Sequence, residues 1–333
     1  MPDEIQNYIG EMHRLGYADA DIKVSLREAG WSYDQLISAF DNAVIHVDGL
    51  KKYFKNTKAV DGISFMIEKG EIFGFLGPNG AGKTTAIRCI MDFLRPDAGQ
   101  IKILKKDSRL HTVELKSDIG YLSGAVRLYE NWTGYEHVDF SSRFYKRPHR
   151  AKEIAQRLTL DLSKKTKDLS SGNRQKLGIV LALMFEPQVL IWDEPTLALD
   201  PLLQQEVYAL LKEASSNGAT VLMSSHNLAE VERVCNRVAI IKQGKIIAID
   251  EIRNLRKKNM YTITVHFFGI LPEKDELISD GVKIIDELER GYVIKVSGDI
   301  NRLLKNVSRF QVEDINIEKA SLEDVFLEFY KEN

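Results

Sequence analysis

Apolar positions in the first 43 residues recur at helical spacing in three short stretches. Gly16 and Gly30 follow the first two stretches, and Ser32 with Gln35 forms a capping-box pair at the start of the third. The expected apolar faces consist of Ile5, Tyr8, Ile9 and Met12, then Ile22, Leu26 and Ala29, then Leu36, Ile37 and Phe40. We therefore expect a three-helix module over residues 1–43, which is either a docking module or a helical decoration packed on its neighbour.

Strand-like and helix-like patterns alternate over residues 44–257. The run "QVLIWDEP" is apolar and bounded by turn signals, which is typical of a buried parallel strand. The run "TAIRCIMDFL" has helical spacing, and its apolar positions are Ile87, Ile90, Met91 and Leu94. This alternation predicts an α/β domain with a mixed, largely parallel sheet.

The pattern changes over residues 258–333. The runs "YTITVHFF", "VKIIDEL", "YVIKVSG" and "FQVEDINIE" are strand-like, and "PEKDELISD" and "INRLLKNV" between them are helix-like. The order β-α-β-β-α-β predicts a small ferredoxin-like C-terminal α+β domain, to which we assign regulation or dimerisation. A last helix is expected with Ser321 and Asp324 at its start and an apolar face of Leu322, Val325, Phe326 and Phe329.

Composition excludes several classes of function. The 333 residues carry a formal net charge of -2, so no basic field indicates nucleic-acid binding. The two cysteines have no metal-like spacing. No apolar run approaches the ~20 residues that a membrane helix needs, and no secretory signal opens the chain. If the protein works at a membrane, we expect it to do so from outside the bilayer.

The run "FGFLGPNGAGKTT", residues 73–85, predicts a phosphate-binding loop. The pattern G-x-x-x-x-G-K-[ST] runs from Gly77 to Thr84, after an apolar strand and before an amphipathic helix. Its glycines let backbone N–H groups point at phosphate oxygens, and the helix N-terminus adds positive partial charge. Lys83 is expected to reach the β- and γ-phosphates, whereas a merely flexible turn would not require a lysine. The expected binding residues are Gly77, Pro78, Asn79, Gly80, Ala81, Gly82, Lys83, Thr84 and Thr85.

A phosphate loop of this kind needs a carboxylate for its metal ion. Asp193 ends the apolar run "VLIWD" and is placed to hold Mg²⁺ together with the Thr84 hydroxyl. Glu194 follows and is placed to polarise the attacking water. The alternative for these two acids is a pair of solvated side chains at a strand end.

Four motifs in sequence order resemble the ATP-binding-cassette ATPases. "GPNGAGKTT" matches the Walker A motif of that family, and "WDEPTLALD" resembles its Walker B motif and D-loop. "LSSGNRQK", residues 169–176, resembles the signature motif, and "SSH" at 224–226 resembles the switch histidine. The resemblance implies a P-loop nucleotide-binding domain with a helical subdomain.

The resemblance also implies roles for single residues. Phe54, with Tyr53 beside it, occupies the place of the adenine-stacking aromatic, with packing at a strand edge as the alternative. His226 would bond the γ-phosphate and position the attacking water. Asp200 would cap the helix that begins at Pro201 and would line a dimer interface.

The signature motif implies a dimer. Ser170, Gly172 and Asn173 would contact the γ-phosphate of an ATP that a second copy of the chain holds. The expected working unit is therefore a head-to-tail dimer with two ATP molecules between its halves, which closes on binding and opens on hydrolysis.

The C-terminal run "DINIEKASLEDVFLEFY" resembles the end of ATPase subunits that serve ABC-2-type exporters, including drug-resistance ATPases. That resemblance implies a separate integral-membrane permease and a place in the cytoplasm on the inner face of the cell membrane. The permease would rest near residues 119–145, where Tyr129, Trp132 and Tyr135 offer an anchoring surface. The alternative for these aromatic residues is core packing of the helical subdomain.

Three departures from the family pattern bear on hydrolysis. Gly124 and Ala125 occupy the place where a glutamine or an acid normally reaches toward the metal ion and the attacking water. Ser171 replaces the usual glycine and Asn173 the usual glutamine of the signature, and Leu197 replaces a common serine in the D-loop. Two alternatives to an exporter ATPase stay open: an ATP-gated regulatory or docking protein with weak hydrolysis, which Gly124 and Ala125 favour, and a soluble cassette protein outside transport, which the single cassette and the lack of a heptad run disfavour.

Overall fold

The computed structural model describes most of the 333 residues, and the described ranges are 2–17, 19–31, 43–145, 147–253, 260–269, 271–279 and 281–319. The chain divides into two compact units, Met1–Asp250 and Glu251–Asn333. The helix expected to begin at Ser32 and the last helix expected at Ser321 lie outside the described residues. The three-module division predicted from the sequence, with its boundaries at 43 and 257, stays a prediction.

Two N-terminal helices pack on the following strands. Helix α1 (Pro2–Arg14) and helix α2 (Asp19–Glu28) form a small cluster of buried side chains with strands β1 (Ala43–Phe54) and β2 (Thr57–Glu68). The cluster consists of Ile5, Ile9, Ile22, Leu26, Ala43 and Met66. This contact favours the interpretation of these helices as a decoration packed on its neighbour, although Leu15, just after α1, and Val24 of α2 remain exposed.

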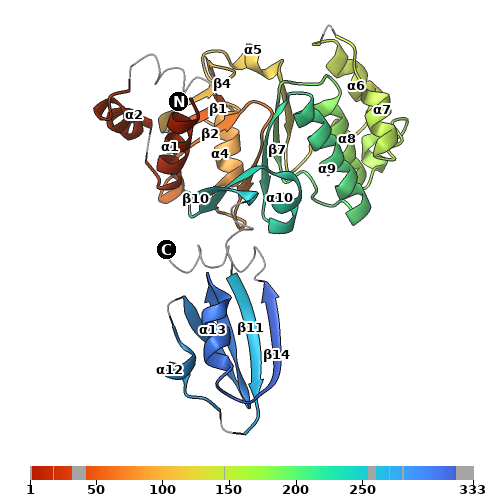
Figure 1. Cartoon of the computed structure of the whole chain (residues 1–333). Helices are drawn as coiled ribbons and strands as arrows, with labels where there is room; N and C mark the ends of the chain where they lie inside the picture. The colour runs from red at the N-terminus through yellow and green to blue at the C-terminus, as the bar shows by residue number, and fades with distance from the viewer. Residues whose placement is uncertain are drawn as a thin grey trace. The chain divides into compact units, whose positions relative to one another are not determined.

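The first unit contains two sheets (Figure 1). The smaller sheet is antiparallel in the order β2-β1-β4-β5, with β4 at Ala98–Ile103 and β5 at Lys106–Asp107. The larger sheet has the order β10-β9-β3-β8-β7-β6, and its pairs β9–β3, β3–β8, β8–β7 and β7–β6 are parallel. Its strands are β3 (Ile72–Leu76), β6 (Ile119–Leu122), β7 (Val189–Asp193), β8 (Thr220–Ser225), β9 (Arg237–Lys242) and β10 (Lys245–Glu251). The predicted α/β domain with a largely parallel sheet is thus confirmed.

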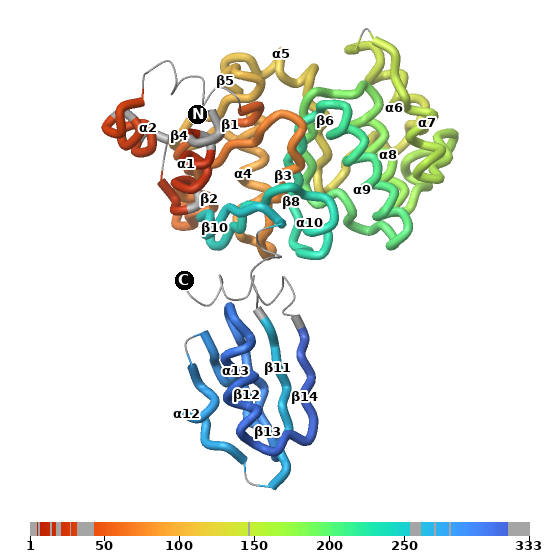
Figure 2. The backbone as a smooth tube through the Cα atoms, in the orientation of Figure 1, coloured from red at the N-terminus to blue at the C-terminus, as the bar shows by residue number. Residues whose placement is uncertain are grey.

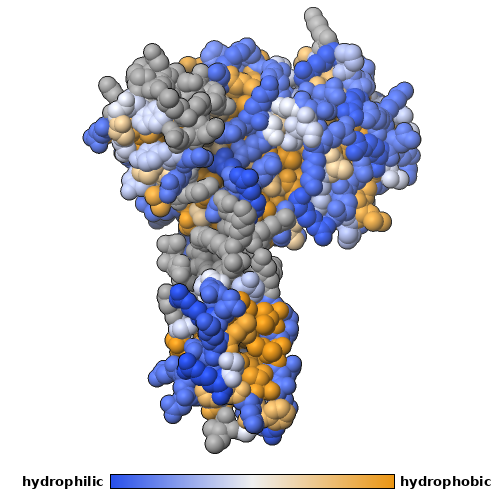
Figure 3. All heavy atoms as spheres, in the orientation of Figure 1, coloured by the Kyte–Doolittle hydropathy of each residue, from blue (hydrophilic) through white to orange (hydrophobic). Residues whose placement is uncertain are grey.

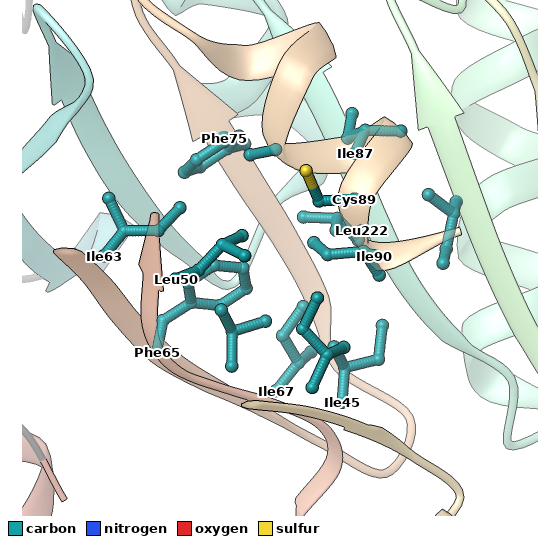
Figure 4. Close-up of a cluster of buried hydrophobic side chains, with 14 of the residues drawn as sticks. Ile45, Leu50, Ile63, Phe65, Ile67, Phe75, Ile87, Cys89, Ile90 and Leu222 are labelled. Atoms are coloured by element: carbon teal, nitrogen blue, oxygen red, sulfur yellow. The ribbon is translucent and has the colours of Figure 1, made fainter. Parts of the chain in front are cut away.

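The main hydrophobic core surrounds helix α4 (Lys83–Ile90), where the two sheets meet. Figure 4 shows Phe65 of β2 and Phe75 of β3 beside Ile87 and Ile90 of α4, and the Cys89 sulfur is the only atom other than carbon among the labelled side chains. Phe65 and Phe73 stack with ring centroids 5.4 Å apart. This core anchors the start of α4, which follows the phosphate loop.

Helix α4 is shorter than its apolar spacing predicts. It ends at Ile90 because Met91 and Asp92 leave the helical conformation, and Asp92 adopts a positive φ of 55°. The expected continuation to Leu94 was therefore wrong. Local backbone geometry overrides side-chain periodicity at such an end.

The remaining helices of this unit cover the larger sheet or form a separate helical layer (Figure 2). Helices α9 (Pro201–Ser216) and α10 (Leu228–Val234) pack on β3 and β8. Helices α6 (Gly134–Ser142) and α7 (Ala151–Arg157) pack on α8 (Ser171–Leu183). The short helices α5 (Thr112–Lys116) and η1 (Thr166–Asp168) complete the described part of the unit. No helix in the described part of the chain is both long and apolar enough to cross a membrane.

The second unit is a four-stranded antiparallel sheet in the order β12-β13-β11-β14. Its elements follow as β11 (Met260–Phe267), α12 (Lys274–Leu277), β12 (Val282–Leu288), β13 (Gly291–Ser297), α13 (Ile300–Val307) and β14 (Val312–Lys319). This is the order expected of a ferredoxin-like β-α-β-β-α-β unit, so that prediction is confirmed. Figure 3 shows apolar residues gathered over β11 and β14 beside α13 on the visible face of this unit.

Candidate functional site

The loop between β3 and α4 requires glycine for reasons of space as well as conformation. A Cβ atom on Gly77 would lie 2.4 Å from the Ile241 carbonyl oxygen, and one on Gly82 would lie 2.2 Å from the Ala59 carbonyl oxygen. Gly82 also has a φ of 109°, a conformation that L side chains rarely adopt. The loop is therefore clamped against the backbones of β9 and β2, which presents the first N–H groups of α4 at a fixed place.

The Lys83 ammonium group is buried and folds back over this loop. Its Nζ donates hydrogen bonds to the carbonyl oxygens of Gly77 at 2.6 Å and Pro78 at 3.2 Å. It also lies 3.3 Å from Glu194 Oε1. The positive charge is thus held between the phosphate loop and the acid that follows β7, so that an entering phosphate can replace the carboxylate as its partner.

Asp193 is the last residue of β7, and its carboxylate accepts hydrogen bonds from two hydroxyl groups. Thr84 Oγ1 donates to Asp193 Oδ2 at 2.7 Å, and Ser224 Oγ donates to Asp193 Oδ1 at 2.5 Å. The pair Thr84 and Asp193 offers the hard oxygen ligands that Mg²⁺ prefers, and Mg²⁺ usually takes few protein ligands beside phosphate oxygens and water. Within the described ranges no group of three or more acidic, histidine or cysteine side chains forms an all-protein metal site. The residues present therefore fit a magnesium ion that arrives with a nucleotide.

Glu194 and His226 form the second half of the site. His226 Nδ1 lies 2.8 Å from Glu194 Oε2, and an Nδ1–H group at this distance donates a hydrogen bond to that oxygen. Glu194 has a positive φ of 50°, and its N–H donates to Ser224 Oγ at 3.1 Å. Strained backbone of this kind is frequent at functional sites, where the surrounding structure holds it in place.

Gly124 lies beside Asp193, as the family resemblance implies. A Cβ atom on Gly124 would lie 3.3 Å from the Asp193 carbonyl oxygen and 3.5 Å from Asp193 Oδ2. Ala125 follows with an exposed side chain, and its N–H donates to Ser123 Oγ at 3.4 Å. Residues 124 and 125 therefore lie next to the candidate metal ligand Asp193, and neither of them has a polar side chain.

The signature residues lie at the N-terminus of α8 and contact the D-loop. Ser170 caps the helix, because its hydroxyl accepts a hydrogen bond from the Asn173 N–H at 3.2 Å. A Cβ atom on Gly172 would lie 2.7 Å from the Ala198 carbonyl oxygen, so only glycine fits this approach. In the part of the chain that the structure describes, no hydrogen bond or ion pair joins these three residues to the phosphate loop. One chain thus brings together the phosphate loop, the two acids and His226. Its signature residues lie apart from this group, at the N-terminus of α8.

Asp200 caps α9 as expected. Its Oδ1 accepts hydrogen bonds from the N–H groups of Leu202 at 3.1 Å and Leu203 at 3.0 Å, and Pro201 occupies the first helical position. The capping part of that prediction is confirmed, and the interface part stays a prediction.

Phe54 and Tyr53 differ in how free their rings are to stack on a base. The Tyr53 hydroxyl donates to Asp61 Oδ1 at 2.5 Å, and the Lys58 ammonium lies 5.8 Å from its ring centroid. Phe54 is 45% exposed, with only Lys52 Nζ over its ring at 5.4 Å among the described residues. Phe54 is therefore the ring of the two that is available for stacking on a base.

Sequence reasoning missed three polar residues around this site. Ser224 bonds Asp193, and the buried Gln175 donates from Nε2 to the Pro195 carbonyl oxygen at 3.0 Å. Glu230 accepts hydrogen bonds from Thr196 and from the last residue of β8. Ser224 belongs to the "SSH" run and Gln175 to the "LSSGNRQK" run, so both lie within motifs quoted above, although neither was assigned a role. Glu230 belongs to no motif and reaches the site from α10.

Known proteins match both units of the chain. The family described as ABC transporter matches residues 60–197, and the family described as ATP-binding protein DrrA1-3-like, C-terminal domain, matches residues 248–330. The bacitracin transport ATP-binding protein BcrA of Bacillus licheniformis is 31% identical over 298 residues, which cover 86% of this chain and 97% of BcrA. The chain belongs to the ABC transporter ATP-binding proteins. The resemblance inferred from the four motifs is confirmed.

This ABC cassette has further relatives of similar length and a close fold neighbour. The uncharacterized ABC transporter ATP-binding protein YhcH of Bacillus subtilis (strain 168) is 31% identical over 299 residues, covering 86% of this chain and 95% of that protein. The solved dimeric structure of a bacterial ABC transporter cassette matches with a TM-score of 0.59 and 25% identity, covering 63% of this chain and 99% of the other. The family is one of ATP-binding ATPases, so the expected cassette fold and enzyme class are confirmed.

Proposed function

We propose that this ABC ATPase is the ATP-hydrolysing subunit of an exporter, and that it drives a separate membrane permease. The convergence of Lys83, Asp193, Glu194 and His226 at the carboxyl ends of β3, β7 and β8 carries the proposal. In open α/β sheets, ligands bind at this edge. The relative BcrA is named for bacitracin transport, and the match of residues 248–330 to a DrrA-like C-terminal domain supports the drug-export class.

ATP is the nucleotide that this site would hold. Backbone N–H groups of the loop from Gly77 to Thr85 would bind its phosphates, and Phe54 would stack on the adenine. Lys83 would exchange Glu194 for phosphate oxygens, which frees that carboxylate for the reaction. Thr84 and Asp193 would hold Mg²⁺, and the ion neutralises charge on the phosphate oxygens when it is bound.

Hydrolysis adds water to the γ-phosphorus and breaks its bond to the bridging oxygen, which leaves ADP and phosphate. Glu194 Oε1, released from Lys83, would accept a hydrogen bond from the attacking water and polarise it. His226, held by Glu194 Oε2, would contact the γ-phosphate and keep the carboxylate at its present angle. Glu194 would therefore act on the attacking water directly, and His226 would position that water through its hold on Glu194.

A second copy of the chain would complete each site. Ser170 and Ser171 are exposed at the start of α8, and this helix N-terminus is the kind of place that binds a phosphate. Ser170, Gly172 and Asn173 would bind the γ-phosphate held by the partner copy in a head-to-tail dimer. The solved dimer of a related cassette supports this arrangement.

The permease would dock on the helical layer from the cytoplasmic side of the membrane. Tyr129 is 59% exposed and Tyr135 is 48% exposed, although Tyr129 also packs on Trp132 with ring centroids 4.4 Å apart. Tyr121 and Tyr145, which belong to the expected docking segment 119–145, line a cavity of about 270 Å³ together with Phe93, Arg147 and Phe185. The exposed rings and the hollow together favour a docking surface over simple core packing.

One observation favours a second candidate function. Gly124 and Ala125 bring no polar side chain to Asp193, which is the arrangement expected of an ATP-gated protein with weak hydrolysis. That protein would close on ATP but release little phosphate.

Phosphate release by the purified full chain separates the two candidates. We expect the wild type to hydrolyse Mg-ATP, Lys83→Ala to lose turnover, and Glu194→Gln to bind ATP and accumulate a dimer in size-exclusion chromatography with light scattering. Equal turnover in the wild type and Lys83→Ala would contradict the ATPase site. An ATP-dependent dimer that forms without phosphate release would favour the regulatory protein, and co-purification with a permease tests the exporter assignment.

A further inference from the structure

Glu230 is a buried acid that the proposed hydrolysis does not use. It lies in the first turn of α10 and is 3% exposed. Its Oε2 accepts a hydrogen bond from the Ser225 hydroxyl at 2.5 Å, and its Oε1 accepts one from the Thr196 hydroxyl at 2.8 Å. One carboxylate therefore links the end of β8 to the loop that follows β7.

The two hydroxyls belong to the segments that carry the candidate catalytic pair. Ser225 immediately precedes His226, and Thr196 lies two residues after Glu194. On the other side of these segments, His226 Nδ1 lies 2.8 Å from Glu194 Oε2. The two segments, the His226–Glu194 hydrogen bond and the Glu230 carboxylate thus form a closed ring of covalent and hydrogen bonds.

This ring restrains a strained part of the backbone. Glu194 has a φ of 50°, a conformation that persists only where the surroundings hold it. The Thr196 hydroxyl is the point at which Glu230 holds the loop after β7. A change at Thr196 is therefore transmitted to Glu194 through two residues of fixed chain.

Burial makes the charge of Glu230 costly, and the hydrogen bonds of the ring offset only part of that cost, because the pKa of Glu230 stays above its usual value. Burial raises the pKa of Glu230, and the nearby Glu194 charge raises it further, whereas the hydrogen bonds from Ser225 and Thr196 and the charge of His226 lower it. Burial and the Glu230 charge together raise the pKa of Tyr208 to about 12. An ionised carboxylate accepts from both hydroxyls at once, which fixes the direction of both hydrogen bonds.

We propose that Glu230 is a positioning residue for ATP hydrolysis, which sets the spacing of Glu194 and His226 by holding Thr196 and Ser225. This inference rests on the proposed ATPase function. In this role Glu230 would act through the two hydroxyls and not by contact with the nucleotide or the attacking water. Misplacement of a reacting group by ~1 Å can cost on the order of 100-fold in rate, so a small change in this ring has a large effect.

The test compares Glu230→Gln, Thr196→Val and the double variant in the full chain. We expect Glu230→Gln to lower kcat roughly ten- to hundredfold, with the KM for ATP and the Kd for ATP in EDTA changed less than about twofold. Thr196→Val should lower kcat in the same way, and the double variant should be no slower than Glu230→Gln, because both changes open the same ring. Glu232→Gln, a half-buried acid on the same helix, is the matched control and should keep the wild-type kcat.

The possible results separate this inference from the function on which it rests. A wild type that turns over faster than Lys83→Ala, together with an unchanged kcat in Glu230→Gln, overturns the positioning role alone. A loss confined to ATP affinity or to folding, or additive effects of the two substitutions, also overturns it. Wild-type turnover no faster than that of Lys83→Ala overturns both. Where Glu230→Gln lacks a cooperative thermal transition, unchanged kcat in Thr196→Val and Ser225→Ala overturns the role.

Discussion

Gly124 and Ala125 leave the edge of the site beside Asp193 without a polar side chain. We expect Ala125→Glu to raise ATP turnover, because a carboxylate there can accept a hydrogen bond from the attacking water. Ala125 is exposed, so the added side chain needs no space in the core. Steady-state phosphate release measures the effect, and Ala125→Leu controls for bulk. Turnover equal to the wild type would show that other groups already replace the missing acid.

The buried Glu230 also predicts a pH dependence of stability. Its folded pKa lies above the ordinary value of 4.5, mainly because of burial, so the folded state binds its proton more tightly than the unfolded state does. Its contribution to stability is present below the unfolded pKa and is lost as the pH rises through the folded pKa. Glutamine does not titrate. The free energy of unfolding of Glu230→Gln should therefore rise relative to the wild type as the pH increases from 4.5.

Urea unfolding of the two proteins across the acidic and neutral range measures this difference. A difference that stays constant over the range would contradict it. The same substitution is expected to lower kcat. Stability should therefore rise while turnover falls, which is the trade-off seen where an active-site residue lowers the stability of the fold.

The start of α8 lies very close to the D-loop, because Gly172 packs against the backbone of Ala198. Alanine ordinarily stabilises a helix position over glycine by roughly 0.5–1 kcal/mol. At Gly172 we expect the opposite, because a Cβ atom would lie 2.7 Å from the Ala198 carbonyl oxygen and the D-loop would have to move. Gly172→Ala should therefore lower the free energy of unfolding and weaken the ATP-dependent dimer in the Glu194→Gln background.

Chemical unfolding and light scattering measure these two effects. Ser171→Ala, at an exposed neighbouring position, is the matched control and should change neither. If Gly172→Ala made the protein more stable and left the dimer unchanged, the prediction would be contradicted. The D-loop would then be able to move away from the added methyl group without loss of stability.

Element patterns predicted the sheets better than they predicted the helix ends. The order of the C-terminal sheet followed from the succession of strands and helices, because few connections are possible for β-α-β-β-α-β. The end of α4 at Ile90 did not follow from periodicity, since the apolar spacing continues to Leu94 while the backbone turns at Asp92. The choice between Phe54 and Tyr53 needed the hydrogen bond from Tyr53 to Asp61.

Across the whole chain, short motifs located the parts of the site that lie next to each other in sequence. Lys83 and Thr84 start one helix, Asp193 and Glu194 end one strand, and His226 follows the next strand. Parallel strands bring these ends together, so the motif order predicted their meeting. The contact of Glu230 was not predictable in this way, because Glu230 belongs to no motif and reaches the loop after β7 from α10 through the Thr196 hydroxyl. Gln175 belongs to the signature run, but that motif did not indicate its hydrogen bonds to the carbonyl oxygens of Glu194 and Pro195.

The bond from Gln175 to the Pro195 carbonyl oxygen has a consequence for the dimer. Gln175 lies in the first turns of α8, whose N-terminus would face the partner's ATP, whereas Pro195 follows Glu194, which would act on the chain's own ATP. A shift of Glu194 during one turnover would therefore be passed by one amide group to the helix that would bind the other nucleotide. In the head-to-tail dimer proposed above, the two ATP molecules would then be consumed cooperatively rather than independently.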